Sequence, residues 1–317
     1  MGRYKEIDLR KVKTHSIRSR KSKVETGQFA RPHRPGASFN DFLDGLPHLL
    51  SGREMRELIG HIVRAKQDGK PVLLMMGAHV IKTGLNPVLI DLMEAGVLDG
   101  LAMNGAGAVH DTELAYFGRT SEDVAEALST GEFGMARETG ELLNLTIQNG
   151  READLGFGEA MGKKILEDNP EFSCLSLLAQ AYRLNIPATV HVALGTDIVH
   201  QHPHADGAAI GTLSLRDFRI FSEAVSRLHG GGVALLFGSA VILPEVFLKA
   251  LTVARNVHGA VTGFYTASFD MIRHYRPGVN VVGRPTQEGG RGFEFTGQHE
   301  LLIPLFAAAL REALAKS

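Results

Sequence analysis

The sequence predicts an α/β fold, a Rossmann-like, doubly wound, mostly parallel sheet with helices on both faces. Three observations predict it. From Lys70 onward, short apolar runs each end in glycine and are followed by a helical pattern. The runs are continuous rather than alternating in polarity, which is typical of strands covered on both faces. Glycine, at 36 of 317 residues, gathers at the ends of these runs, where tight strand-to-helix turns need it.

Six apolar runs are expected to form the strands. They are PVLLMMGA (71–78), DGLAMNGAGA (99–108), PATVHVALG (187–195), GVALLFGS (232–239), AVTGFYT (260–266) and VNVVG (279–283). Helical patterns lie between and after these runs, at 86–96, 215–231, 243–259 and 298–316. A further helical layer is expected over 39–69, and two helices in a longer insertion at 118–170.

Charge and cysteine content exclude several classes of protein. Lysine and arginine total 34 and aspartate and glutamate 35, so the formal net charge is −1 and the chain lacks the positive field of a dedicated nucleic-acid binder. Cys174 is the single cysteine, which rules out an intramolecular disulfide and a cysteine-based zinc cage. No stretch approaches the roughly 18–20 apolar residues of a membrane span. We expect a cytoplasmic protein that binds neither nucleic acid nor membrane.

Residues 1–40 are basic and interrupted by proline, without helical or strand periodicity. They predict a basic N-terminal arm, followed by a single α/β domain over residues 41–317. Such an arm either binds phosphate groups and anionic surfaces, or is solvated or packed against a partner, as charged segments usually are.

Glycine-rich turns follow four of the predicted strands: Gly77-Ala78-His79, Asn104-Gly105-Ala106-Gly107, Gly195-Thr196-Asp197 and Gly238-Ser239-Ala240. In open α/β sheets, ligands bind beyond the carboxyl ends of the strands, where glycine lets the backbone approach a phosphate. Four such turns at one edge predict a nucleotide or another phosphate-bearing ligand. The alternative is that they are turn residues only, and neither the Walker pattern nor a strict GxGxxG is present.

The segment GAHVIKTGLNPVLIDLMEAGVLDGLAMNGAGAVHD resembles the deoxyhypusine synthase family. The later segments IPATVHVALGTD, FGSAVILPE and GQHELLIPLF resemble that family in the same order, so the resemblance covers about residues 70–315. It implies a deoxyhypusine synthase-like fold, NAD as cofactor, a small-molecule substrate and a homo-oligomer, specifically a homotetramer.

The resemblance also implies which residues contact NAD. The turn after the first strand corresponds to Ala78, His79, Val80, Ile81 and Lys82, and the turn after the second to Asn104, Gly105 and Ala106. The remaining cofactor-binding positions correspond to Asp197, Ser239, Pro285, Thr286, Gln298 and His299.

Departures from the family are as informative as the matches. A carboxylate pair of the family is here His110-Asp111, and its acidic, lysine-bearing loop has no counterpart, since no lysine occurs between Lys249 and Lys316. A Schiff base requires a lysine, so deoxyhypusine synthesis as the family performs it is not expected. Arg284 and Arg291 stand near the missing loop and favour a neutral or anionic substrate over a polyamine. The alternative is that these arginines point to solvent or pair with Glu288 and Glu294.

The residue types then suggest catalytic candidates, namely His110, Asp111, His200 and Glu288, because hydride chemistry with NAD needs a base near neutral pH. We expect an NAD-dependent enzyme, a transferase or oxidoreductase acting on a small substrate, and we assign no metal site. One alternative is a non-catalytic, NAD-binding regulatory protein. Another is a metal-assisted hydrolase that uses the cluster His200, His202 and His204, in which Pro203 would have to turn the chain so that the histidines converge.

Overall fold

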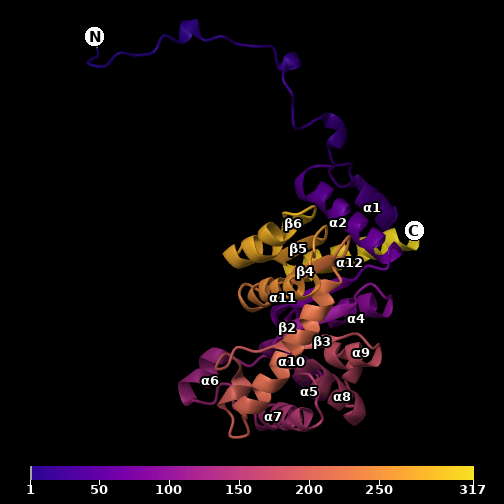
Figure 1. Cartoon of the computed structure of the whole chain (residues 1–317). Coiled ribbons are helices and arrows are strands. Elements are labelled where there is room, and N and C mark those ends of the chain that lie inside the picture. Colours follow the sequence, from indigo (N-terminus) through magenta and orange to yellow (C-terminus); the bar gives the residue numbers. More distant parts are fainter. Residues whose placement is uncertain (1) are drawn as a thin grey trace. The chain divides into compact units, whose positions relative to one another are not determined.

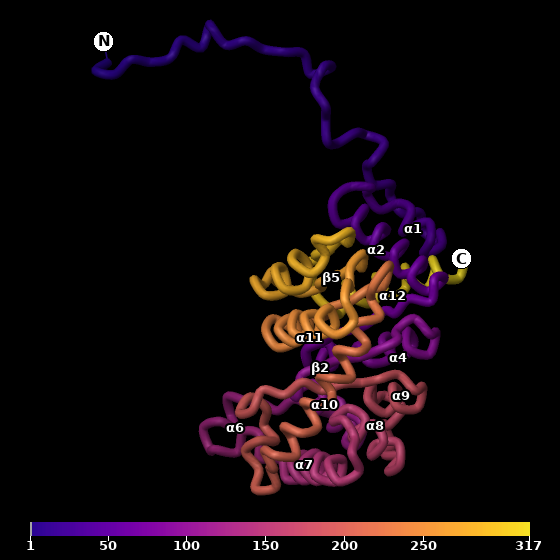
Figure 2. Tube along the Cα trace, in the orientation of Figure 1, coloured from indigo at the N-terminus to yellow at the C-terminus, as the bar shows by residue number. Residues whose placement is uncertain are grey.

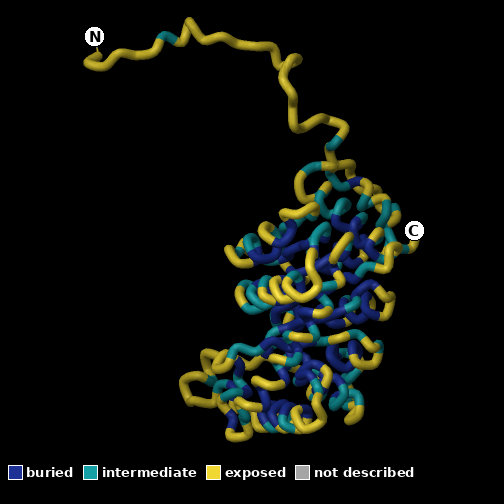
Figure 3. Tube along the Cα trace, in the orientation of Figure 1, coloured by how far each residue is buried: buried dark blue, intermediate teal, exposed yellow. Residues whose placement is uncertain are grey.

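The structure is a computed structural model of the chain, in which residues 2–317 are described. The chain divides into two units, Met1–Arg53 and Glu54–Ser317. In the first unit, residues 2–36 are exposed apart from Asp8 and Gln28 (Figure 3), and helix α1 (Phe39–Gly45) follows them. Helix α2 (Leu50–Gln67) begins in the first unit and ends in the second. The division into an arm of residues 1–40 and a domain of residues 41–317 stays a prediction.

The second unit is built on a six-stranded, all-parallel sheet with strand order β3-β2-β1-β4-β5-β6 (Figure 1). The strands are β1 (Val72–Met76), β2 (Gly100–Asn104), β3 (Ala188–His191), β4 (Val233–Phe237), β5 (Tyr265–Asp270) and β6 (Arg291–Thr296). This is the order of a doubly wound nucleotide-binding sheet, in which the chain leaves β1 in one direction and later returns to pair β4 on its other side. The predicted fold class is confirmed.

The helices of the second unit cover both faces of the sheet. They are α3 (His79–Lys82), α4 (Asn86–Glu94), α5 (Gly105–Phe117), α6 (Val124–Thr130), α7 (Arg137–Glu152), α8 (Phe157–Asp168), α9 (Leu177–Arg183), α10 (Gly207–Ser226), α11 (Ile242–His258) and α12 (His299–Ala315). On one face, Leu73 and Leu236 pack in one cluster with α10 and α11. On the other, the Phe237 ring lies 5.0 Å from Phe269 and 6.3 Å from Phe306 of α12. Among residues 2–317, no helix combines the length and apolar content needed to cross a membrane.

The predictions for the last two strands in the sequence are wrong. The run 279–283 forms part of a π-helical turn, Pro277–Gly283, and the last strand is β6, which was not expected. Only Phe293 and Phe295 are buried in β6, so its sequence alternates instead of forming a continuous apolar run. The strand predicted at 260–266 is also misplaced, because β5 begins only at Tyr265, after Gly263, whose backbone is left-handed (φ 67°).

The insertion at 118–170 contains three helices, α6, α7 and α8, rather than the expected two. The extra helix is α6, a seven-residue helix with no buried residue. It is too short for its two large apolar residues, Val124 and Leu128, to establish a helical period. Figure 2 shows α6, α7, α8 and α10 gathered at one end of the second unit.

A buried carboxylate joins three elements beside β3. Asp217 of α10 is fully buried, and its Oδ2 accepts hydrogen bonds from the backbone N–H of Val190 (2.7 Å) and Gly158 (3.0 Å). Burial raises the pKa of Asp217 to about 7, against hydrogen bonds that lower it. The raised pKa makes stability depend on pH.

We expect Asp217→Asn to flatten that pH dependence. Between about pH 4 and 7 the folded state keeps the Asp217 proton while the unfolded state, at its ordinary pKa of 3.8, loses it, so stability falls as pH rises through this window. Asparagine stays neutral in both states. Urea unfolding at pH 4 and at pH 8 measures how much unfolding free energy each protein loses between these two pH values. The loss should be smaller in the variant than in the parent protein by a few kcal/mol, because each unit of pKa difference corresponds to roughly 1.4 kcal/mol.

His191, whose pKa burial lowers to about 4, acts in the opposite direction, but it is present in both proteins and cancels in the comparison. Equal losses in the variant and the parent protein would contradict the assignment to Asp217.

Candidate functional site

A cavity of about 750 Å³ lies beside the carboxyl end of β2, where ligands of α/β sheets bind. Its lining comes from α3, α5, α6 and α7 and from the loops after α5 and β3. Its size falls in the range of small-molecule sites, about 300–1,000 Å³. Four residues predicted from the sequence line it: Lys82, Ala106, His110 and Asp197.

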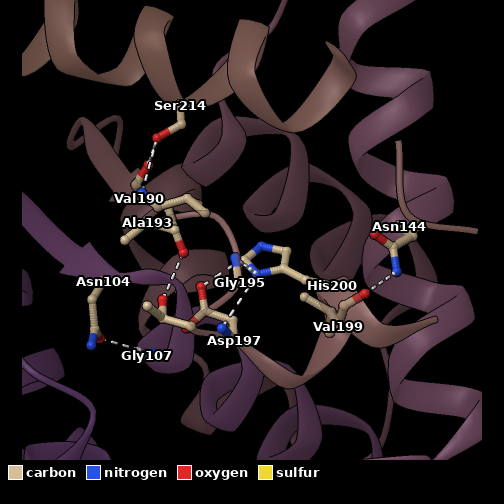
Figure 4. Close-up of polar contacts among 12 residues, drawn as sticks. Asn104, Gly107, Asn144, Val190, Ala193, Gly195, Asp197, Val199, His200 and Ser214 are labelled. Atoms are coloured by element: carbon tan, nitrogen blue, oxygen red, sulfur yellow. Dashed lines mark hydrogen bonds and ion pairs between the residues drawn. The ribbon is translucent and has the colours of Figure 1, made fainter. Parts of the chain in front are cut away.

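The first turn of α5 forms one wall of this cavity. Asn104 is the N-cap, and its side-chain oxygen accepts a hydrogen bond from the Gly107 N–H at 3.1 Å (Figure 4). The Asp197 carboxylate accepts a hydrogen bond from the Ala106 N–H and lies so close to Gly105 that a Cβ there would overlap it. Asp197 is 8% exposed, and burial raises its pKa to about 6. The positive end of α5 is thus occupied by a carboxylate of the chain itself.

His200 holds the loop that carries Asp197. Its Nδ1 accepts hydrogen bonds from the backbone N–H of Gly195 (3.1 Å) and Asp197 (3.3 Å), as Figure 4 shows. Nε2 therefore carries the hydrogen in the neutral ring, and it lies 4.0 Å from Asp197 Oδ2. Burial lowers the pKa of His200. A ring engaged in this way positions the loop.

His110, one turn into α5, belongs to a polar network in the cavity wall. Its Nδ1 lies 2.6 Å from Thr120 Oγ1, and the Thr120 hydroxyl also makes a short hydrogen bond to Glu113 Oε2. The second Glu113 oxygen accepts a hydrogen bond from Thr139 of α7 at 2.9 Å. Burial lowers the pKa of His110, while Glu113 raises it and Lys82 lowers it further. A neutral imidazole at pH 7 can accept a proton from a ligand.

Asp111 does not line the cavity, although it follows His110. It is fully buried, and its two oxygens accept hydrogen bonds from Asn86, the Ser176 hydroxyl and the backbone N–H of Leu177 and Leu178. Burial raises its pKa to about 6, and these four donors oppose the rise. Neighbouring helical residues point about 100° apart, so only one of the two can face the cavity. Asp111 instead holds the start of α9.

A second group of predicted residues meets where the strand order reverses. Gly77 after β1 and Gly238 after β4 approach so closely that a Cβ on Gly77 would overlap the Gly238 carbonyl oxygen. Beside them, the His79 and His299 rings lie 5.4 Å apart, and Ser239 Oγ accepts a hydrogen bond from the Leu243 N–H at 3.3 Å.

His299 in this second group is 1% exposed, and its Nε2 contacts the Phe269 carbonyl oxygen at 3.3 Å. Of the other predicted cofactor residues, Ala78 and Gln298 are the positions before α3 and α12. Val80 and Ile81 are buried in the core and cannot contact a ligand through their side chains.

Three predicted residues lie at the opposite edge of the sheet. Pro285, Thr286 and Glu288 precede β6, and the Glu288 carbonyl oxygen accepts a hydrogen bond from the Gly263 N–H before β5. In a parallel sheet, positions before strands are at the amino edge, so these three do not join the cavity or the His79–His299 group.

The arginines near the missing family loop are also remote from the cavity. Arg291 pairs with Glu57 at 2.6 Å and Glu54 at 3.1 Å, and Arg284 contacts Asn280 at 3.1 Å. Their expected preference for an anionic substrate therefore loses its basis. The cavity lining itself contains four carboxylates, Glu113, Glu122, Glu138 and Asp197, against the cations Lys82 and Arg119.

The histidine cluster does not converge. His202 is 9% exposed and its Nε2 contacts the Gly134 carbonyl oxygen at 2.8 Å, whereas His204 is exposed and His200 faces the loop at Gly195. Within residues 2–317, no group of three histidine, cysteine or acidic side chains is arranged to hold a metal. The arrangement that the hydrolase alternative requires is not formed.

Sequence reasoning missed Glu113, Thr120 and Thr139, which complete the His110 network. Glu113 could have been predicted from the sequence, because it follows His110 by three residues in a segment expected to be helical and so lies on the same helix face. Thr120 and Thr139 had none, since they come from a loop and a different helix.

We expect Gly105→Ala to destabilise the protein, by about 1–3 kcal/mol, because the new methyl group would displace the Asp197 carboxylate from the start of α5. Gly211→Ala is the matched control. Gly211 is an exposed position inside α10 with open space around its Cα, so alanine there should stabilise by up to about 1 kcal/mol. Urea unfolding of both variants would measure the difference, and equal stabilities would show that Asp197 does not depend on Gly105.

No family model matches the sequence, and no curated protein does so. Solved structures share the fold. The apo structure of ArgZ, an arginine dihydrolase from the ornithine-ammonia cycle in cyanobacteria, is 17% identical with a TM-score of 0.52 over 83% of this chain and 33% of that one. The ternary complex of AgrE with ornithine and NAD+ is 14% identical with a TM-score of 0.51, over 84% and 34%.

A candidate deoxyhypusine synthase from Entamoeba histolytica is 13% identical with a TM-score of 0.50, over 86% of this chain and 92% of that one. The chain spans about a third of the length of ArgZ and AgrE. At such identities the likeness concerns the fold, which is the Rossmann-like α/β fold of these proteins.

Proposed function

We propose that this protein is an NAD-dependent enzyme that acts on a small hydroxyl- or amino-bearing substrate at the carboxyl edge of its sheet. The observation that carries the proposal is the cavity of about 750 Å³, in which His110, Lys82 and Asp197 meet from three separate elements. Support also comes from AgrE, a protein of similar fold whose structure contains NAD+ and ornithine. A transferase activity on the same cofactor remains part of the proposal.

The residues present fit a dinucleotide at two places along this edge. At the reversal of strand order, Gly77 and Gly238 approach each other closely beside His79 and Ser239, and dinucleotides bind outside such a reversal. At the start of α5, the Asp197 carboxylate is suited to accept hydrogen bonds from ribose hydroxyl groups. Helix α3 connects the two places, since it begins at His79 and ends at Lys82 in the cavity.

The first N–H groups of α5 are not free to bind the phosphates of the cofactor. The N–H groups of Ala106 and Gly107 already bond to Asp197 and Asn104. A pyrophosphate therefore needs other donors, and Lys82 is the cation of the predicted cofactor set that lines the cavity. We assign Lys82 to the phosphates, Asp197 to a ribose, and His79 and Ser239 to the part of the cofactor at the strand reversal. His299 is 1% exposed, as buried as Ile81, and is left out of this assignment.

NAD+ supplies a hydride acceptor, so oxidation of a carbon that bears a hydroxyl or amino group leaves one proton for the protein to take. His110 is the base we assign, because its ring is neutral at pH 7 and lines the cavity. His200 is a weaker candidate, because its unprotonated Nδ1 is already engaged by two backbone N–H groups. Asp111 and Glu288 lie outside the cavity and take no part in this step.

A non-catalytic NAD-binding protein would share the cofactor residues and lack turnover. The two functions are separated by incubating the protein with NAD+ and panels of small alcohols and amines while following NADH absorbance. Binding of NAD+ without reduction across the panels would favour the non-catalytic alternative.

We expect NAD+ to bind and to raise the melting temperature with concentration, as a ligand selective for the native state must. Asp197→Asn should weaken NAD+ binding about tenfold, because a neutral amide replaces one charge-assisted hydrogen bond. Titration calorimetry on both proteins would measure this.

Asp91→Asn is the matched control, since Asp91 is an exposed residue of α4 paired with Arg311, and its affinity should equal that of the parent protein. Glu288→Gln tests the amino edge and should also leave affinity unchanged. Absence of NAD+ binding at millimolar concentration, or a loss in Glu288→Gln equal to that in Asp197→Asn, would contradict the assignment.

A further inference from the structure

The His110 network contains a chain of hydrogen bonds whose direction is determined by the groups that form it. Thr120 has one hydroxyl hydrogen, and it contacts both Glu113 Oε2 and His110 Nδ1. A carboxylate only accepts hydrogen bonds, so the Thr120 hydrogen goes to Glu113. The Thr120 oxygen is then the acceptor for His110, and the hydrogen between them, across 2.6 Å, belongs to Nδ1.

We propose that Glu113 and Thr120 are positioning residues that hold His110 in its Nδ1–H tautomer, so that Nε2 is the basic nitrogen presented to substrate in the cavity. The proposal rests on the proposed function for the role of His110 as a base. The direction of the hydrogen bonds does not depend on that function and can be tested without it.

The geometry around Glu113 supports this direction. Thr139 donates its hydroxyl hydrogen to Oε1, and Thr120 donates to Oε2, so both carboxylate oxygens are engaged and the side chain is held from two elements. Glu113 lies 3.9 Å from His110 Nδ1, which is too far for a direct hydrogen bond. Thr120 is therefore the link between the carboxylate and the imidazole.

The backbone around Thr120 places its hydroxyl group. Gly118 and Ser121 on either side adopt left-handed conformations, with φ of 65° and 71°. Left-handed backbone is unfavourable for serine, so the loop keeps this shape only where the surroundings determine it. Thr120 is thereby turned back onto α5, and its side chain reaches two residues, His110 and Glu113, that lie on one face of that helix.

The other nitrogen of His110 is left for a ligand. Among the described residues, Nε2 has no hydrogen-bond partner, and the side chain is 18% exposed and lines the cavity. The charged groups that act on the ring are Glu113 from its own helix and Lys82 from α3. Burial, with a smaller contribution from Lys82, lowers the His110 pKa and outweighs the opposing effect of Glu113. The neutral ring is therefore favoured, and it has one hydrogen to place. In the neutral ring, a hydrogen on Nδ1 leaves Nε2 with its lone pair.

The tautomer is measured directly by long-range 1H–15N spectra of protein labelled with 15N-histidine at pH 8, with the His110 signals assigned by comparison with His110→Gln. In the full-length parent protein, the spectrum should show the Nδ1–H form in at least tenfold excess. Thr120→Ser keeps the hydroxyl group and should keep this form. Thr120→Val removes the acceptor and should abolish the excess.

Glu113→Gln gives the sharpest test. A glutamine amide can donate to the Thr120 oxygen, which frees the Thr120 hydrogen to bond Nδ1, so His110 should change to the Nε2–H form. A role of Glu113 and Thr120 in folding alone would lower the melting temperature of the variants without reversing the tautomer. An Nε2–H signal in the parent protein, or the parent spectrum in Thr120→Val, would overturn the proposal.

The tautomer of His110 and the binding of NAD+ are tested by separate measurements, so either proposal can fail without the other. If the parent protein shows Nδ1–H and NAD+ fails to bind, the positioning of His110 stands and the cofactor assignment fails. If NAD+ binds and the parent protein shows Nε2–H, the cofactor assignment stands and the roles of Glu113 and Thr120 fail.

Discussion

The pairing of β1 with β4 determines where a ligand can approach this protein. Because β1 pairs with β2 on one side and β4 on the other, the chain leaves the centre of the sheet in both directions, and the connections diverge above the carboxyl ends. The pairing also brings Gly77 and Gly238 into a contact that leaves no room for a side chain on Gly77. Glycine is therefore required at this position, where the connections of a doubly wound sheet diverge.

Three buried carboxylates hold the starts of three helices in the second unit. Asp111 bonds the first N–H groups of α9, Asp217 bonds Gly158 at the start of α8, and Asp197 bonds Ala106 at the start of α5. Each is buried and has a raised pKa, so each costs free energy when ionised. The N–H donors and the positive end of a helix offset part of that cost. An acidic residue in this region is therefore not by itself a sign of catalysis, as Asp111 demonstrates.

Helix geometry explains why neighbouring residues of α5 have different roles. Gly105 and Ala106 in the first turn meet Asp197, whereas His110 and Glu113, one turn later and three residues apart, share the face that lines the cavity. Asp111 lies between them in sequence and points into the core. One helix thus supplies part of the cavity wall, an imidazole and a buried carboxylate, depending only on which face each residue occupies.

The sequence by itself determined the fold class, since four of the six strands, β1 to β4, are buried in a parallel sheet and their apolar runs, bounded by glycine, can be recognised without tertiary information. It also indicated several residues at the carboxyl edge, such as Lys82 and His110, because a residue that follows a strand in a parallel sheet must lie there. It failed for β6, because only alternate residues of this strand are buried and its sequence contains no continuous apolar run.

Only the tertiary structure decided which candidates meet. It separated Glu288 from the cavity, because this residue precedes a strand instead of following one. It joined Thr120 and Thr139 to Glu113, although one comes from a loop and the other from a helix 26 residues away from Glu113. Contacts of this kind depend on how helices and loops pack. A local pattern of residues does not indicate which distant side chain will form the contact.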